Sequence, residues 1–255
     1  MRWHCHELFH RMPPGATAGG IGVVIDVLRA STTMITALSG GAERVVPVAE
    51  VSEARRRAAE IGPGAVLGGE RAGIRIEGFD LGNSPAEYVA ERVAGKTVVI
   101  TTTNGTAALA ACTAAREVLV GAIVNRSAVA AAARRLAERE ACGSVHLVCA
   151  GTDGLVTAED VLGAGAILDA AARHPRAADD ELDPAAVAAR AAFRALAAAH
   201  PADLPAALES TCAAAPGGAN LVSLGMSADI AFAARIDTLE IVPRLDRRTG
   251  GLRPA

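Results

Sequence analysis

The chain has 255 residues, 51% of them hydrophobic, and a formal net charge of −3. This length fits a single α/β unit over residues 1–255, with two lobes that meet near residue 125 as the alternative. The small net charge excludes the basic surface that nucleic acids or anionic membranes need, and no apolar run approaches the ~20 residues of a membrane span. We therefore expect no nucleic-acid or membrane partner. Because residues 1–6 lack the apolar core segment and cleavage site of a secretory signal, we also expect a cytoplasmic protein.

The numbers of lysines and cysteines limit how the protein could bind a phosphate or a metal ion. Lys96 is the only lysine, and the Gly-Lys-Ser/Thr signature of nucleotide-binding loops is absent. A bound phosphate would therefore be held by arginine, backbone N–H groups or a metal ion. The five cysteines contain no C-x-x-C pair, which favours buried free thiols over disulfides or a zinc site.

Short apolar segments alternate with helical segments along the chain. Strands are expected over residues 3–9, 21–27, 44–48, 65–67, 96–101, 117–122, 144–150 and 238–242, and the tail after Pro243 is expected to fray. This alternation predicts an α/β fold with a mainly parallel or mixed sheet flanked by helices. Because the carboxyl ends of parallel strands share one edge, we expect the active site there.

Asp26 is the single charge in the apolar, β-branched segment 21–27, which is typical of a strand buried on both faces. A buried carboxylate has to be paired, hydrogen-bonded or bound to a metal ion. Arg29 is the nearest cation, and Ser31 and Thr32 add hydroxyls at a helix start, which favours an anion. The segment predicts either a phosphate or carboxylate site, or a structural Asp26–Arg29 pair with Ser31 as the N-cap.

Glu70 and Arg71 stand among glycines directly after the segment 65–67. Glycines let the backbone turn sharply and let a ligand approach it closely. The two charges therefore indicate either part of the site or an ordinary surface ion pair in a turn.

The loop that follows carries Asp80 and Asn83. Ser84 is explained as a helix cap, with Glu87 completing a capping box. Asp80 and Asn83 have no such structural explanation, and we expect them at the site.

The segment Thr103-Asn104-Gly105-Thr106 joins a strand to a helix. Hydroxyls, an amide and a glycine at such a junction form a neutral cradle suited to an oxyanion, although helix caps use the same residues. Asn125 stands at a similar junction after the strand at 117–122. We predict that these residues bind substrate.

Glu159 and Asp160 lie near the start of a later helix. Thr157 and Asp160 have the spacing of a capping box, which offers a structural explanation for Asp160. Glu159 has no comparable explanation.

Together these segments resemble the 2-phosphosulfolactate phosphatase family. The matching blocks are VIDVLRAST at 24–32, GER at 69–71, GFDLGNSP at 78–85, TTNGT at 102–106, ED at 159–160 and DIAF at 229–232, followed by Asp237 and Val242-Pro243. The resemblance spans nearly the whole chain. It implies a magnesium-dependent phosphatase that converts 2-phosphosulfolactate to sulfolactate in coenzyme M biosynthesis, with some tolerance for phosphate esters of other 2-hydroxy acids. It also implies an α/β fold unlike the common phosphatase folds.

Several acids for a divalent cation, together with arginines for an anion, indicate Mg²⁺-assisted phosphoryl chemistry. We expect the catalytic group to consist of Asp26, Arg29, Glu70, Arg71 and Asp80. The expected metal ligands are Asp26, Glu70, Asp80 and Asp160. Substrate binding is assigned to Ser31, Thr32, Asn83, Thr103, Asn104, Gly105, Thr106, Asn125 and Glu159.

Two alternatives remain open at this point. Cys5 and Arg11 spell the H-C-x5-R pattern of cysteine-dependent phosphatases, but the Pro13-Pro14 that follows does not suit an anion-binding loop. The second alternative is a non-catalytic binding protein for phosphorylated hydroxy acids. A homo-oligomer is expected on general frequency alone.

Overall fold

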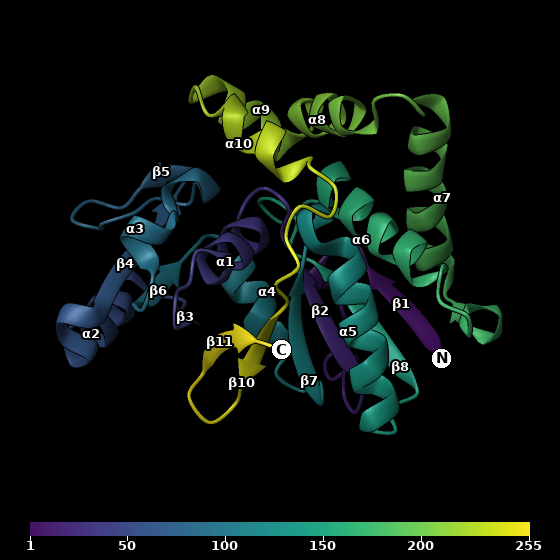
Figure 1. The fold of residues 1–255 in the computed structure, drawn as a ribbon, viewed down its shortest axis with the longest axis horizontal. Coiled ribbons are helices and arrows are strands. Elements are labelled where there is room, and N and C mark those ends of the chain that lie inside the picture. Colours follow the sequence, from purple (N-terminus) through teal and green to yellow (C-terminus); the bar gives the residue numbers. More distant parts are fainter.

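The computed structural model describes all 255 residues as an α/β fold, in which one mixed sheet is flanked by helices (Figure 1). The strands are β1 (Arg2–His6), β2 (Ile21–Ile25), β3 (Arg44–Pro47), β4 (Ala65–Arg71), β5 (Ile74–Arg75), β6 (Thr97–Thr101), β7 (Glu117–Gly121), β8 (Ser144–Cys149), β9 (Glu181–Leu182), β10 (Pro243–Asp246) and β11 (Gly251–Pro254). The helices are α1 (Ala30–Ser39), α2 (Val51–Ile61), α3 (Ala90–Val93), α4 (Gly105–Ala111), α5 (Arg126–Arg139), α6 (Ala158–Ala171), α7 (Pro184–Ala199), α8 (Leu204–Ala214), α9 (Pro216–Ser223) and α10 (Ser227–Ala233). The predicted fold class is confirmed.

The sheet consists of two parallel blocks joined by a hairpin. Its strand order is β5-β4-β6-β3-β11-β10-β7-β2-β8-β1-β9. Strands β4, β6 and β3 are parallel to one another, and so are β7, β2, β8, β1 and β9. In the β10–β11 hairpin, β10 is antiparallel to its neighbour β7, and β11 is antiparallel to its neighbour β3. Strands that come before residue 125 and strands that come after it therefore belong to one continuous sheet.

Helices α1 and α4 pack against both blocks. One core cluster contains Met34 of α1 and Leu109 of α4 together with Val98 of β6 and Val120 of β7. Eight of the ten residues of α1 are buried, as expected for a helix with core on most of its surface. A second cluster joins the β1, β2 and β8 side of the sheet to α5, α6 and α7. These contacts hold the ends of β2, β4 and β6 near one another.

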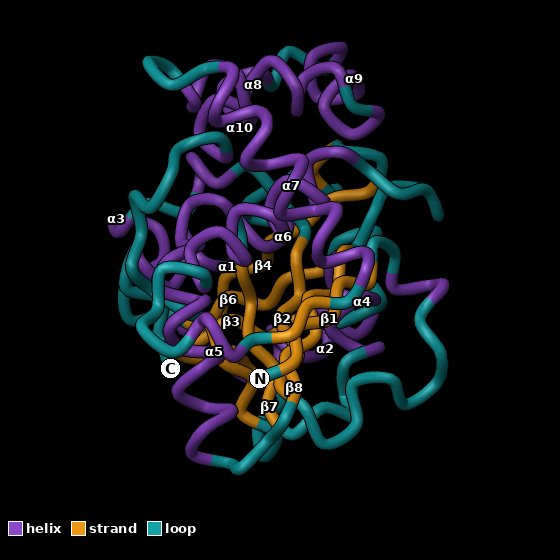
Figure 2. The backbone as a smooth tube through the Cα atoms, turned by 90° about the vertical axis from the view of Figure 1, so that its right-hand side faces the viewer, coloured by secondary structure: helices purple, strands orange, loops and turns teal.

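Helices α8, α9 and α10 lie together at one end of the molecule in both views (Figures 1 and 2). Asp183 caps the preceding α7, accepting a hydrogen bond from the backbone N–H of Ala186 at 2.7 Å, as the Asp-Pro pair predicts. None of the ten helices combines the length and hydropathy that a membrane crossing requires.

The C-terminal prediction was wrong. No strand forms over residues 238–242, and the tail expected to fray forms the β10–β11 hairpin instead. The Asp246 carboxylate accepts hydrogen bonds from the Arg248 N–H and the Thr249 hydroxyl, both at 2.9 Å, which fixes the turn. Leu252 is fully buried, so this segment anchors the centre of the sheet.

The two predicted capping boxes do not form either. The Ser84 hydroxyl donates to Asp229 at 2.5 Å, and Glu87 accepts from the Gly82 N–H at 3.1 Å. Asp160 accepts from backbone N–H groups of other loops, and Thr157 makes no side-chain cap. In each case tertiary contacts compete successfully with the local cap.

Candidate active site

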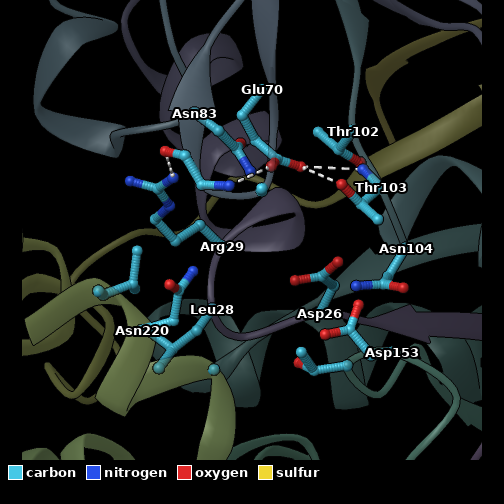
Figure 3. A pocket seen from close by; sticks show the side chains of 15 residues that line it. Asp26, Leu28, Arg29, Glu70, Asn83, Thr102, Thr103, Asn104, Asp153 and Asn220 are labelled. Carbon is cyan, nitrogen blue, oxygen red and sulfur yellow. Dashed lines mark hydrogen bonds between the residues drawn. The ribbon is translucent and has the colours of Figure 1, made fainter. Parts of the chain in front are cut away.

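A small polar cavity lies where the loops after β2, β4, β6 and β8 meet α9 (Figure 3). Its volume is about 90 Å³, and three of its fifteen lining residues are hydrophobic. The lining consists of Asp26, Leu28, Arg29, Glu70, Ala72, Gly73, Asn83, Thr102, Thr103, Asn104, Thr152, Asp153, Gly217, Asn220 and Leu221. The cavity therefore collects polar residues that are far apart in the sequence.

Asp26 is a buried carboxylate on this cavity. Its Oδ1 accepts a hydrogen bond from the N–H of Ala30 at 3.0 Å, whereas its Oδ2 accepts none from the protein. Burial and then the negative charge of Asp160 raise its pKa to about 8, with Glu70 adding to the effect. The Ala30 hydrogen bond and the charge of Arg29 oppose this rise. Such a strongly raised pKa marks a group that a bound cation would convert to its charged form.

Arg29 forms its ion pair with Asp229 and not with Asp26. Its Nη1 lies 2.7 Å from Asp229 Oδ2, and its Nη2 donates to the carbonyl oxygen of Gly73 at 2.9 Å. Asp229 comes from α10 and also accepts the Ser84 hydroxyl. The guanidinium is thereby held rigidly at the cavity wall with much of its charge compensated.

Glu70 joins two loops of the site. Its Oε1 accepts from the N–H and the hydroxyl of Thr103, at 2.9 and 3.1 Å, and its Oε2 accepts from the N–H of Gly73 at 2.7 Å. Figure 3 shows these contacts across the top of the cavity. Glu70 thus ties the end of β4 to the loop after β6.

Asp160 and Glu159 lie behind the cavity wall and do not line it. Asp160 accepts hydrogen bonds from the N–H groups of Val27, at 2.8 Å, and Gly151, at 2.9 Å. Burial and then the charge of Glu159 raise its pKa to about 7. The pKa of Glu159 is raised to about 7 chiefly by burial, and its Oε2 is buried without a hydrogen-bond partner.

Other residues predicted from the sequence support the cavity from outside. The Ser31 hydroxyl accepts from the N–H of Asp26 at 2.9 Å, and the Thr32 hydroxyl donates to Val27 O at 2.8 Å. The Thr106 hydroxyl donates to Thr102 O at 3.0 Å. A Cβ on Gly105 would lie 2.7 Å from Asp26 Oδ2, so its close approach to that carboxylate requires glycine.

Arg71, Asp80 and Asn125 lie away from the cavity. Arg71 donates to Ala49 O and to the Thr101 hydroxyl, both at 3.0 Å. Asp80 is exposed and accepts from the N–H of Leu67 at 2.8 Å. The Asn125 amide is fully buried and bonded to backbone groups. Each side chain thus has a structural contact that accounts for its position, and the structure does not group them with Asp26.

Cys5 is buried in the middle of β1, and its backbone N–H donates to the carboxylate of Asp183. A cysteine phosphatase needs an exposed thiolate within a curled anion-binding loop. The structure therefore provides no cysteine-phosphatase site at Cys5.

The family model described as 2-phosphosulpholactate phosphatase matches residues 8–248. The chain belongs to this family. It is similar to probable 2-phosphosulfolactate phosphatases of Deinococcus radiodurans, 41% identical over 88% of this chain and 87% of that protein, and of Carboxydothermus hydrogenoformans, 38% identical over 90% and 88%. The match to the protein of that name from Clostridium acetobutylicum is 46% identical and spans 58% of this chain and 60% of that relative.

The sequence marks Asp153 as an unexplained polar residue after a strand, but Asp153, Asn220 and Asp229 were assigned no role at the site. Asp153 lies four residues after the end of β8 and has a positive φ of 51°. Asn220 and Asp229 come from α9 and α10, which only tertiary packing brings to the cavity. Asp229 belongs to the DIAF block of the family resemblance, but no local pattern indicates that it would pair with Arg29, and Asn220 carries no local signal.

The oxygen donors of the cavity suit a Mg²⁺ ion that takes only some of its ligands from the protein. No three His, Cys, Asp or Glu side chains converge into a complete metal site. Magnesium, however, is usually held by one or two carboxylates, with substrate phosphate and water completing the shell. Asp26 has an unbonded oxygen, and Asp153 and Asn104 lie beside it (Figure 3). Asp26 with one of these neighbours satisfies that requirement.

Proposed function

We propose that this protein is a phosphatase that hydrolyses 2-phosphosulfolactate, or a related phosphorylated 2-hydroxy acid, with the help of Mg²⁺. The observation that carries the proposal is the unbonded oxygen of buried Asp26, in a cavity of the strand-end loops of a chain from this family. The resemblance also implies a place in coenzyme M biosynthesis and in the cytoplasm, with a homo-oligomer as a further expectation.

The charge balance of the cavity supports a metal ion. Three carboxylates, of Asp26, Glu70 and Asp153, face a single cation, Arg29, whose charge Asp229 already offsets. Without a cation the lining therefore offers almost no net positive charge to a substrate that carries phosphate, carboxylate and sulfonate groups. A divalent cation reverses the balance and lets the same residues bind an anion.

Each group then has a distinct part. Asp26, with Asp153 or Asn104 beside it, would hold the ion, and Mg²⁺ would neutralise charge on the phosphoryl oxygens. The Thr102 hydroxyl, which only accepts a hydrogen bond from the Thr106 N–H, and the Asn220 amide line the cavity and can donate to further substrate oxygens, whereas the Thr103 hydroxyl already donates to Glu70. Arg29, whose Nη1 and Nη2 already donate to Asp229 and Gly73, would contact a carboxylate or sulfonate with the N–H groups that remain.

We assign the attack to water and not to the Asp26 carboxylate. Enzymes that form an aspartyl-phosphate carry a second acid two residues after the first, and Leu28 stands there in this chain. Glu70 and Asp160 each have both carboxylate oxygens occupied by N–H or O–H donors, so they position the loops that surround Asp26.

The proposal is tested by phosphate release from 2-phosphosulfolactate, phospholactate and phosphoglycolate, each with Mg²⁺ and with a chelator. We expect turnover with Mg²⁺, preference for the sulfonated substrate and no turnover with chelator. Glu77→Gln, a change at an exposed residue outside the cavity, serves as the matched control. Binding of the esters without turnover would contradict the proposal and favour a non-catalytic binding protein. Turnover in the presence of chelator would show that the reaction does not need Mg²⁺.

A further inference from the structure

A second cavity lies at the β10–β11 hairpin, at the opposite end of the molecule from α9 and α10 (Figure 1). Its volume is about 440 Å³, within the usual range of small-molecule sites. Four of its eight lining residues are arginines: Arg244, Arg247, Arg248 and Arg253. Glu117 and Asp246 also line the cavity, so its four arginines and two acids give a formal charge of +2 in a chain whose net charge is −3.

The charges of these arginines are only partly compensated. Arg244 is paired with Glu117 through both Nε, at 2.8 Å, and Nη2, at 2.5 Å. Arg247 donates only to carbonyl oxygens, those of Thr113 and Ala115, so it is anchored without losing its charge. A guanidinium held by carbonyl groups keeps its full attraction for an anion.

The other two arginines have weak partners. Arg248 is 82% exposed and lies 3.9 Å from Asp246. Arg253 lies 3.6 Å from Glu43, whose side chain is 58% exposed, and its Nε is buried without a hydrogen-bond partner. Such exposed ion pairs contribute little to stability, so these guanidinium groups remain free to bind an anion. A buried N–H donor without a partner needs a ligand or a water molecule to accept its hydrogen bond.

We propose that this cavity binds a small molecule that carries two or more phosphate groups. Planar guanidinium groups match phosphate oxygens in pairs, and the lining arginines come from β10, the turn and β11, with Arg244 and Arg253 opposite each other in the hairpin. No aromatic ring lines it, so no base would stack there, and the ligand is recognised by its charge. The inference is independent of the proposed function, because the site shares no residue with the Asp26 cavity.

Binding there would also stabilise the hairpin that joins the two parallel blocks. Strand β10 pairs with β7 and β11 pairs with β3, and the cavity is lined by both hairpin strands and by Glu117 of β7. A ligand that binds the folded state alone raises the unfolding temperature by mass action.

The test is calorimetric titration of pyrophosphate into the full chain in the presence of a chelator, where the carboxylate-rich Asp26 cavity offers almost no net positive charge to an anion. We expect one equivalent to bind the wild type, and Arg248→Gln and Arg253→Gln each to weaken binding by about tenfold. Arg56→Gln, on the exposed face of α2, is the matched control and is expected to change affinity by less than about twofold.

Circular dichroism establishes that each variant is folded, and exposed Arg248 carries the test if Arg253→Gln unfolds. Absence of pyrophosphate binding to the wild type would overturn the proposal. So would equal affinities of the wild type and Arg248→Gln, or equal losses in Arg248→Gln and Arg56→Gln. None of these results depends on phosphatase activity, so a failure here is separable from a failure of the proposed function.

Discussion

Arg29 and Asp229 form a buried ion pair, with Nη1 2.7 Å from Oδ2, between residues 200 positions apart in the chain. The pair connects the start of α1, at the cavity, to α10. Asp229 also accepts the Ser84 hydroxyl, so one carboxylate fixes two loops of the candidate site.

Replacing Asp229 by asparagine is expected to leave the Arg29 charge buried and unpaired. Breaking a buried pair from one side costs about 3–5 kcal/mol of unfolding free energy. Because Arg29 also loses its orientation, kcat/KM should fall as well. The measurement is denaturant unfolding beside the phosphatase assay, with Glu60→Gln, which breaks an exposed pair with Arg56, as the control. If both variants lose the same small amount of unfolding free energy, the buried Arg29–Asp229 pair stabilises the protein no more than an exposed pair does.

Gly105→Ala tests the close packing around Asp26. A Cβ at this position would lie 2.5 Å from Ala30 Cβ and 2.7 Å from Asp26 Oδ2, so the helix start or the carboxylate has to move. We expect a loss of about 1–3 kcal/mol in stability together with reduced kcat/KM. Gly143→Ala, where no atom lies within 4 Å of the added Cβ, should be close to neutral. Unchanged activity in Gly105→Ala would show that the position of Asp26 is not critical.

The acids around Asp26 predict how stability depends on pH in the absence of divalent cations. The folded-state pKa of Asp26 is about 8 against an ordinary value of 3.8, so the folded state binds more protons between these two values. Stability therefore falls as pH rises through this window, and Asp160 and Glu159, with pKa values of about 7, act in the same direction.

Thermal unfolding in chelator at about pH 5.5 and about pH 8.5 measures this effect. The wild type should unfold at a lower temperature at the higher pH, and Asp26→Asn should show a smaller decrease. Burial lowers the pKa values of His146 and His6, which opposes the decrease below about pH 6.5, so the comparison of the two proteins carries the test. The same change with pH in both proteins would contradict the burial of an ionisable acid at Asp26.

Leu252→Ala tests the C-terminal hairpin. Leu252 is fully buried at the centre of the sheet, where it pairs with Val45 of β3. Removing its side chain should cost about 2–5 kcal/mol of unfolding free energy, because a cavity remains between the two blocks. Val222→Ala, a truncation at an exposed position, should cost much less unfolding free energy. A neutral Leu252→Ala would indicate that the hairpin frays after all.

The sequence was sufficient for the fold class because the buried strands are unambiguous. The segment at 21–27 is apolar and β-branched, and the structure buries β2 on both faces. The strand expected over residues 44–48 likewise forms as β3, over Arg44–Pro47. Local composition determines such elements, since few alternatives satisfy the same pattern.

The hairpin and the partners of the site required tertiary structure. Arg244 and Asp246 make β10 look like a polar tail, and only their contacts with Glu117 and the turn explain why it is ordered. Sequence proximity suggested Asp26 as the partner of Arg29, but packing of α10 placed Asp229 there. The sequence located Asp26, Glu70, Thr103 and Asn104, which line the cavity, although their roles stay predictions.

The most direct test of the central claim is the rate of phosphate release from 2-phosphosulfolactate as a function of Mg²⁺ concentration, for the wild type, Asp26→Asn and Asp80→Asn. If Asp26 holds the ion, Asp26→Asn should need at least about 100-fold more Mg²⁺ or lose activity altogether. Asp80 is exposed and outside the cavity, so Asp80→Asn should match the wild type. An Asp26→Asn variant with the Mg²⁺ dependence of the wild type, or a loss confined to Asp80→Asn, would contradict the account.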